Sequence, residues 1–142
     1  MVADLETVRD RENRIRGYLR DLRDLAQISE ADFLRNRERQ YAVLHALQLA
    51  IEAAVEIATH ICAADALGIP TSYVEAFGLL ERKGILDPPL AQDLKRMARF
   101  RNRIVHFYAE VDLTRVYRIL QERLGDLDRY LLAIERYLGE EP

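Results

Sequence analysis

The stretch of sequence that decides the fold is YAVLHALQLAIEAAVEIATHICAA, residues 41–64. Apolar side chains surround nearly the whole circumference of the helix that it predicts, so this helix is expected at the centre of a bundle. One polar stripe interrupts them, and it is either the narrow side that meets water or one wall of a polar cleft. With about one polar group per turn, the segment is not expected to span a membrane. The stripe consists of His45, Gln48, Glu52, Glu56 and Thr59.

Helical spacing continues on the N-terminal side of this stretch. Residues 3–26 carry apolar side chains at intervals of three and four, with charged side chains on the other faces. Asp10 with Arg14, and Glu12 with Arg16, are spaced to form ion pairs. The helix that contains the central stretch is expected to run unbroken from about residue 30 to 66, with Ser29 as its cap.

Three further helices are expected on the C-terminal side. A short one lies between a cap at Thr71 or Ser72 and a stop at Gly84. The next begins with Asp87 as cap and proline in its first turn, and the last covers about residues 112–138. The scarcity of glycine (six) and proline (four) disfavours a many-stranded β fold. The prediction is all-α: an antiparallel up-and-down helical bundle of four long helices and one short one, in a single domain over residues 1–142.

Composition limits the partners. The chain of 142 residues is 49% hydrophobic and 32% charged, which is typical of a folded globular protein. Its formal net charge of -3 predicts neither a general nucleic-acid binder nor a membrane-surface binder, so an anionic partner must be held by a local patch. Cys62 has no cysteine to pair with and is expected to be buried in a reducing, cytoplasmic protein. The N-terminal residues contain no apolar signal segment.

The helix that follows Asp87 places a charge on its apolar side. At about 100° per residue, Arg101 falls in the middle of the apolar seam. Burial of an unpaired guanidinium costs several kcal/mol, so Arg101 must meet a carboxylate, an anion or a solvated interface. The seam consists of Leu90, Leu94, Met97, Ile104 and Tyr108.

The opposite side of this helix is basic. The run KRMARFRNR, residues 95–103, holds five cations and no acid, and His106 is expected on the same face as Lys95, Arg99, Asn102 and Arg103. These basic side chains either form ion pairs with acidic side chains of a neighbouring helix or bind an anion, for which phosphate is the obvious candidate. Histidine moves protons near neutral pH, so the second interpretation suggests phosphodiester cleavage. The histidines and the cysteine lack metal-ligand spacing, so we expect neither a metal nor another cofactor.

Arg101 and His106 are five residues apart, which places them about 140° apart around an ideal helix. One regular helix therefore does not aim both side chains at one phosphate. Either the helix unwinds near His106, or a second copy of the chain completes the site. We favour a homodimer in which the paired helices line a shared cleft.

The motif RNRIVHFY, residues 101–108, resembles the signature of the HEPN superfamily, and most closely that of the HepT-like toxins of toxin–antitoxin pairs. The segments AIEAAVEIATHI, GIPTSYVEAFGLLERKGIL and VDLTRVYRIL are also similar to that family. The resemblance implies a HEPN-like, all-helical homodimer that acts as a metal-independent endoribonuclease, with Arg101 and His106 as the catalytic pair and Asn102 supporting the geometry of the motif. Arg99 and Arg103 would bind RNA phosphates.

The resemblance also implies a partner, a minimal nucleotidyltransferase antitoxin that attaches nucleotide to the tyrosine matched by Tyr108. The chain departs from the family pattern at Arg99, where a small residue is frequent, and at Glu56, where aspartate is common. Two alternatives remain. One is a non-catalytic helical partner that holds a nucleotide or substrate for a nucleotidyltransferase. The other is a helical dimerisation protein without an anion site.

Overall fold

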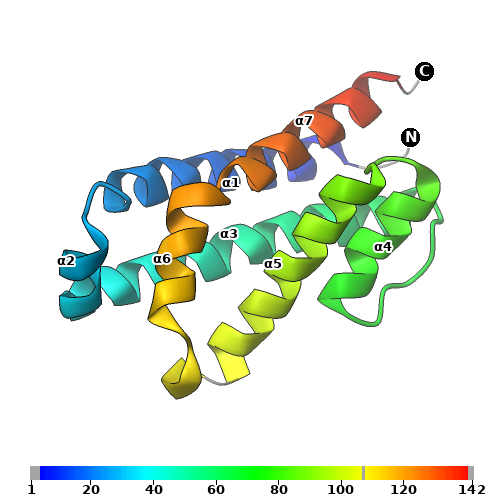
Figure 1. Ribbon diagram of the computed structural model, residues 1–142. Helices are drawn as coiled ribbons and strands as arrows, with labels where there is room; N and C mark the ends of the chain where they lie inside the picture. The colour runs from blue at the N-terminus through cyan, green and yellow to red at the C-terminus, as the bar shows by residue number, and fades with distance from the viewer. Residues whose placement is uncertain (1–3, 107, 141–142) are drawn as a thin grey trace.

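The computed structural model describes residues 4–106 and 108–140, including their side chains except those of Tyr108 and Glu140. Over these residues the chain forms seven α-helices, one short 3₁₀ helix and no strand, which confirms the predicted all-α bundle (Figure 1). The elements are α1 (Leu5–Leu25), α2 (Glu30–Arg35), α3 (Arg37–Ala64), α4 (Tyr73–Lys83), α5 (Pro88–His106), η1 (Tyr108–Glu110), α6 (Leu113–Glu122) and α7 (Gly125–Glu140).

Helix α3 is the central helix, as its composition predicts. It runs through the middle of the bundle in Figure 1 and contacts α1, α2, α4, α5 and α6. By length and by a mean hydropathy of 1.4 it resembles a membrane span, yet 61% of its most apolar window is buried inside the protein, as expected of a core helix. Its most buried large side chains, each at most 1% exposed, are Leu47, Ile51, Ile57 and Ile61.

Several helix ends lie where the sequence predicts them. The Ser29 hydroxyl oxygen accepts a hydrogen bond from the backbone N–H of Asp32 at 3.2 Å. Ser72, rather than Thr71, caps α4. Asp87 caps α5 by accepting from the N–H of Leu90 at 2.9 Å. Gly84 ends α4 with a φ of 84°, a left-handed conformation that glycine adopts without strain.

The expectation of an unbroken helix from about residue 30 to 66 is wrong at Asn36. Asn36 has an extended conformation (φ -109°, ψ 93°) that separates α2 from α3, and α3 ends at Ala64. The Asn36 side-chain oxygen accepts from the N–H of Arg39 at 3.0 Å, so it caps α3. A short polar side chain that satisfies a free backbone donor favours a new helix start at this residue.

The expected last helix is also divided. Arg123 and Leu124 separate α6 from α7, and the N–H of Asp126 donates to the carbonyl of Arg123 at 3.1 Å in a tight turn. The apolar repeat crosses this turn without a change of side, because Leu120 before it, Leu124 within it and Leu127 beyond it are all buried. The repeat therefore predicts the buried face but not the bend.

Helix α1 departs from the prediction at Glu12. Asp10 and Arg14 form the expected ion pair, with 3.2 Å between Nε and Oδ2. The Glu12 side chain instead points into the core, where it is fully buried and neither oxygen has a hydrogen-bond partner among the described residues. Burial, and then the nearby Glu135 carboxyl group of α7, raise the pKa of Glu12 to about 7.

Candidate functional site

Arg101 meets a carboxylate, which is one of the three environments that its place in the apolar seam allows. Its Nε and Nη2 atoms donate to the same oxygen of Glu52, Oε2, at 3.0 and 2.7 Å. Both side chains are largely covered, with 16% of Arg101 and 22% of Glu52 exposed. Gln48 donates to that Glu52 oxygen at 3.3 Å. The ion pair links α5 to the polar stripe of α3 and offsets the cost of burying both charges.

Two further contacts fix the orientation of the Arg101 guanidinium. Its Cζ atom lies 4.5 Å from the ring centroid of Tyr73 on α4, within the range of a cation–π interaction. Its Nη1 atom donates to the side-chain oxygen of Asn102 at 3.3 Å. Arg101 therefore contacts α3, α4 and its neighbour on α5, and these contacts orient its guanidinium.

Three residues of the polar stripe of α3, Glu52, Glu56 and Thr59, line a cleft, as the second interpretation predicts, whereas His45 lies outside that cleft and is exposed, as the first predicts. The cleft has a volume of about 440 Å³ and lies between α1, α3 and α4. Glu52 and Tyr73, which hold Arg101, belong to its lining. Glu56 also belongs to this lining and accepts from Nε of Arg11 on α1. Glu56, which stands where aspartate is common in the family, thus connects α3 to α1 through this ion pair.

His106 is the last residue of α5, and its side chain is exposed. Helix α5 is continuous from Arg101 to His106, so it does not unwind between the two residues. Five residues of regular helix place their side chains about 140° apart. A single chain therefore directs Arg101 toward α3 and α4, and His106 to another side of α5.

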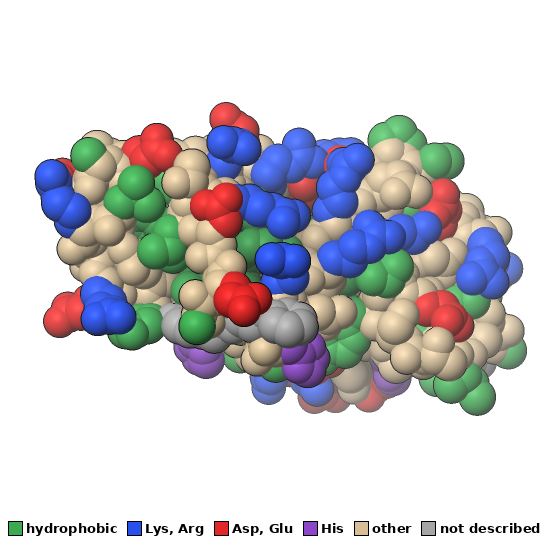
Figure 2. All heavy atoms as spheres, turned by 60° about the horizontal axis from the view of Figure 1, so that its bottom comes forward, with side chains coloured by type: hydrophobic (Ala, Val, Ile, Leu, Met, Phe, Trp, Pro, Cys, Tyr) green, Lys and Arg blue, Asp and Glu red, His purple; other side chains and the backbone are tan. Residues whose placement is uncertain are grey.

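The side of α5 that carries His106 is an arginine face. Arg96, Arg99, Arg103 and His106 follow the spacing i, i+3, i+7, i+10, which aligns them along one side of the helix, and all four are exposed. Figure 2 shows Lys and Arg side chains gathered across the middle of the surface over α5 and α6. We use the term arginine face for these four residues.

The other predicted members of the basic face lie elsewhere. The placement of Lys95 with His106 is wrong, because Nζ of Lys95 donates to Glu81 on α4 at 2.8 Å. Asn102 is half-buried, and its side chain turns to Arg101. Arg99 and Arg103 form no ion pair with any residue that the structure describes. The interpretation in which acids of a neighbouring helix pair with the basic residues is therefore wrong for these two arginines.

The predicted place of Tyr108 in the apolar seam concerns a side chain that the structure does not describe, so it stays a prediction. The helix ends at His106, and Tyr108 begins the separate 3₁₀ helix η1. Its side chain lies outside the part of the chain that the structure describes. The residue therefore belongs to the connection between α5 and α6, directly beyond the arginine face.

Tyr73 is the contact of Arg101 that sequence reasoning misses. It opens α4, and no periodic pattern relates position 73 to position 101. Glu52 carries a better signal, because a carboxylate on an otherwise apolar helix and a guanidinium in an apolar seam each need a buried partner. Pairing the two unexplained charges identifies the contact.

The described residues contain no group of three or more His, Cys, Asp or Glu side chains that could hold a metal ion. Cys62 is fully buried, as expected, and burial raises the pKa of its thiol above the usual value. A thiol in this environment is mainly protonated and acts as a small apolar group.

Comparisons with known proteins agree with the resemblance of the motif. The family profile described as Ribonuclease HepT-like matches residues 15–134. The mRNA nuclease HepT of Shewanella oneidensis is 32% identical over 125 residues, which cover 87% of this chain and 94% of that protein. The tRNA nuclease HepT of Aphanizomenon flos-aquae is 33% identical over 121 residues, or 85% of this chain and 82% of its own length.

A solved structure has the same fold. The tri-AMPylated HEPN toxin of Shewanella oneidensis, in complex with its MNT antitoxin, superposes with a TM-score of 0.87. It is 28% identical in sequence, and the match covers 94% of this chain and 99% of the toxin.

Proposed function

Because this chain belongs to the HepT-like ribonuclease family, we propose that it is an RNA-cleaving toxin whose site is built on Arg101 and His106. The observation that carries the proposal is the fixed Arg101 guanidinium, five residues before an exposed histidine that ends the same helix. Two nuclease relatives, one acting on mRNA and one on tRNA, support RNA as the substrate.

The chemistry follows from the properties of the two side chains. His106 takes the proton of the ribose 2′-hydroxyl, whose oxygen attacks the adjacent phosphorus, or gives a proton to the 5′-oxygen that leaves. Arg101 stabilises the negative charge that develops on the phosphoryl oxygens. Glu52 and Asn102 keep Arg101 in one position, so little reorganisation is needed when this charge develops. Arg99 and Arg103 bind the neighbouring phosphates of the strand.

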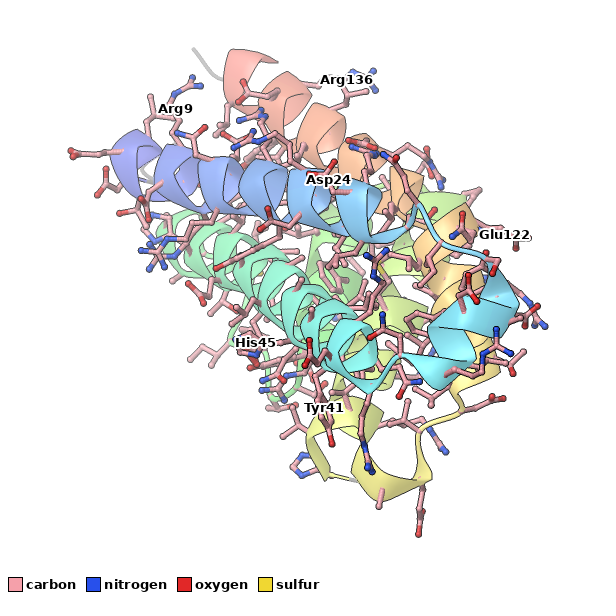
Figure 3. The ribbon with its side chains drawn as sticks, turned by 90° about the vertical axis from the view of Figure 1, so that its left-hand side faces the viewer. Arg9, Asp24, Tyr41, His45, Glu122 and Arg136 are labelled. Atoms are coloured by element: carbon pink, nitrogen blue, oxygen red, sulfur yellow. The ribbon has the colours of Figure 1, made fainter. Side chains whose placement is uncertain are left out.

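A second copy of the chain brings Arg101 and His106 together in this proposal. The continuous helix between them directs the two side chains apart, so the homodimer combines Arg101 of one copy with His106 of the other. Apolar surface for such a contact lies beside His106, where Val105 is 40% exposed, and on α3, where Tyr41 is 49% exposed. Figure 3 shows Tyr41 and His45 on one side of the bundle and Arg9 and Arg136 on the opposite side.

The proposed partner is a minimal nucleotidyltransferase antitoxin that silences the toxin by attaching nucleotide to Tyr108. The solved toxin that is described as tri-AMPylated and bound to an MNT antitoxin supports this part of the proposal. Tyr108 lies two residues beyond His106, so nucleotide added there would place extra phosphates next to the catalytic histidine. Both proteins would act in the cytoplasm, where RNA and nucleotide are available.

The experiment that tests the function compares purified wild-type protein with His106→Ala on total RNA. We expect wild-type protein to cleave RNA in EDTA as well as in Mg²⁺, and His106→Ala to lose cleavage by about 100-fold or more while its circular dichroism and melting temperature are unchanged. Full cleavage by His106→Ala, or a strict requirement for Mg²⁺, would contradict the proposal.

The second candidate function is a non-catalytic helical partner that holds a nucleotide for a nucleotidyltransferase. The ion pair of Arg101 with Glu52 favours it, because a paired arginine already has a structural role. The same cleavage assay separates the two functions. The binding partner would leave RNA intact, and its function would require Arg101 but not His106.

A further inference from the structure

A groove between α5 and α6 adjoins the arginine face. It has a volume of about 240 Å³, smaller than a site for a drug-sized ligand. Its floor is apolar and comes from α3, α5 and α6, whereas much of its rim is arginine. The floor residues are Ile51, Met97, Phe100 and Ile119, and the rim arginines are Arg96, Arg115, Arg118 and Arg123.

Two of the rim arginines keep their charge available for a ligand. Asp93 and Asp126, two of the three acids in the lining, are already engaged by Arg123. Glu122 is the third, and it is exposed. Arg115 and Arg118, one turn apart on α6, are exposed and form no ion pair with any residue of the described chain. The open side of the groove therefore offers two guanidinium groups to an anion.

The floor holds one of these two charges against an aromatic ring. The Cζ atom of Arg115 lies 5.5 Å from the ring centroid of Phe100, which is only 3% exposed. Unpaired RNA bases are bound by stacking on aromatic rings or on guanidinium planes, and the adjacent phosphates by arginine. An apolar floor and two arginines without ion pairs among the described residues, one of them held over Phe100, match a nucleotide, which combines a flat base with an adjacent phosphate.

The groove and His106 are connected by the arginine face. Arg96 belongs both to the groove rim and to this face, and His106 follows it ten residues later, about 15 Å along the helix. Arg99 and Arg103 lie between them and are unpaired within the described residues. A strand held in the groove therefore has cations along its path to the histidine.

We propose that the groove between α5 and α6 binds an unpaired base of the RNA strand, with Arg115 and Arg118 on the phosphates beside it. This substrate site rests on the proposed cleavage at His106 and lies on a different side of α5 from Arg101. It predicts that the protein binds single-stranded RNA more tightly than duplex RNA, since a base in a duplex is stacked on both faces and does not enter the groove.

The first test measures binding in the full chain with His106→Ala, which prevents cleavage. The probe is a short fluorescein-labelled single-stranded RNA of mixed sequence, free or annealed to its complement. Arg115→Ala with Arg118→Ala should weaken single-strand binding about 10-fold or more and reduce the salt slope by about 1.4. The control removes two exposed arginines of other helices, Arg20→Ala with Arg82→Ala, and should change the affinity less than about twofold.

A second variant tests the base itself without a change of charge. Ile119→Asn puts a polar amide into the apolar groove floor, where Ile119 is partly buried, and adds no aromatic ring on which a base could stack. It should weaken the binding of single-stranded RNA about fivefold and leave the binding of the duplex unchanged. Circular dichroism verifies that the helices remain.

The possible results distinguish a failure of the proposed RNA site from a failure of the proposed function. Equal RNA affinity of the Arg115/Arg118 variant and the control variant would overturn the inference, even if wild-type protein cleaves RNA. Loss of antitoxin binding or of the dimer, with RNA affinity retained, would also overturn it and assign the groove to a protein interface. Absence of cleavage by wild-type protein would contradict the proposed function, while the binding comparison would still report on the groove.

Discussion

The two charged sides of α5 differ in how their charges are held. On the side toward α3 and α4, Arg101 is mostly buried, donates twice to Glu52 and lies over Tyr73. On the side that carries His106, Arg99 and Arg103 are exposed and form no ion pair within the described residues. One side presents a charge that its contacts orient, and the other presents exposed charges without ion pairs among the described residues.

This difference indicates a division of roles. A fixed cation suits the stabilisation of charge in a transition state, because it requires no reorganisation at that moment. Exposed arginines without ion pairs suit the binding of a flexible polyanion, whose phosphates need no exact register. Helix α5 carries both Arg101 and the arginine face, but on different sides, so one copy cannot direct Arg101 and His106 at the same phosphate. This is the physical reason to expect a second copy at the site.

The largest effect is expected from Arg101→Ala. Removal of the fixed cation should lower the rate of RNA cleavage about 100- to 1,000-fold, with a smaller effect on RNA affinity. Single-turnover kinetics separates the two. Arg101→Lys keeps the charge but not the planar fork or the stacking on Tyr73, so it should restore little of the rate. If Arg101→Ala cleaves RNA at a rate within about threefold of wild type, Arg101 does not stabilise the transition state, and the proposed difference in role between the two sides of α5 is wrong.

Glu12→Gln should have the next largest effect, and on stability alone. Glu12 is buried in α1 near Glu135 of α7. Because it belongs to neither charged side of α5, its substitution should change the stability of the bundle without changing the rate of RNA cleavage. Above pH 8 the variant should be more stable than wild type by roughly 2 to 3 kcal/mol, whereas at pH 4 the two should be equal. Urea unfolding at several pH values measures this difference, and cleavage should be unchanged.

The sign of this prediction follows from proton linkage. Burial and the Glu135 carboxyl raise the pKa of Glu12 in the folded state from 4.5 to about 7, while the nearby Arg9 and Arg16 oppose the shift. The folded state therefore holds a proton that the unfolded state has lost between these pH values. The stability linked to Glu12 is complete below pH 4.5 and is lost as the pH rises through 7. The difference in the free energy of unfolding between wild type and Glu12→Gln should change between pH 5 and pH 8. The same difference at both pH values would contradict the raised pKa of Glu12.

The smallest effect is expected from Glu52→Gln, which keeps the shape of the side chain but removes its charge. Stability should fall by about 1 to 2 kcal/mol, because the pair is largely buried and Arg101 keeps its contacts with Tyr73 and Asn102. Cleavage should fall about tenfold, less than for Arg101→Ala, since the cation remains but is held less firmly. Loss of cleavage equal to that of Arg101→Ala would give Glu52 a direct part in the chemistry.

The sequence predicts the fold through the pattern of its apolar residues. The nearly all-apolar circumference of residues 41–64 identifies the central helix, and Ser29, Ser72 and Gly84 mark helix ends. The pattern does not predict the breaks at Asn36 and Arg123. A bend leaves the buried face intact, so the apolar spacing does not report it.

For the site, the position of Arg101 in the apolar seam predicts that it needs a partner, and a carboxylate of the polar stripe provides it. The contact with Tyr73 depends on how α4 packs against α5, which no local pattern encodes. Glu12 shows the converse limit. Its spacing with Arg16 predicts a surface ion pair, yet its place between Val8 and Ile15 on the apolar stripe of α1 turns it into the core.

A mixed dimer tests the central claim, that Arg101 and His106 reach one phosphate from two copies of the chain. Differently tagged Arg101→Ala and His106→Ala chains are co-expressed, and the dimer that carries both tags is purified and assayed on RNA. If each site combines Arg101 of one copy with His106 of the other, one of the two sites is intact, and cleavage should be about half that of wild type. A mixed dimer as inactive as the two parent homodimers would contradict the claim.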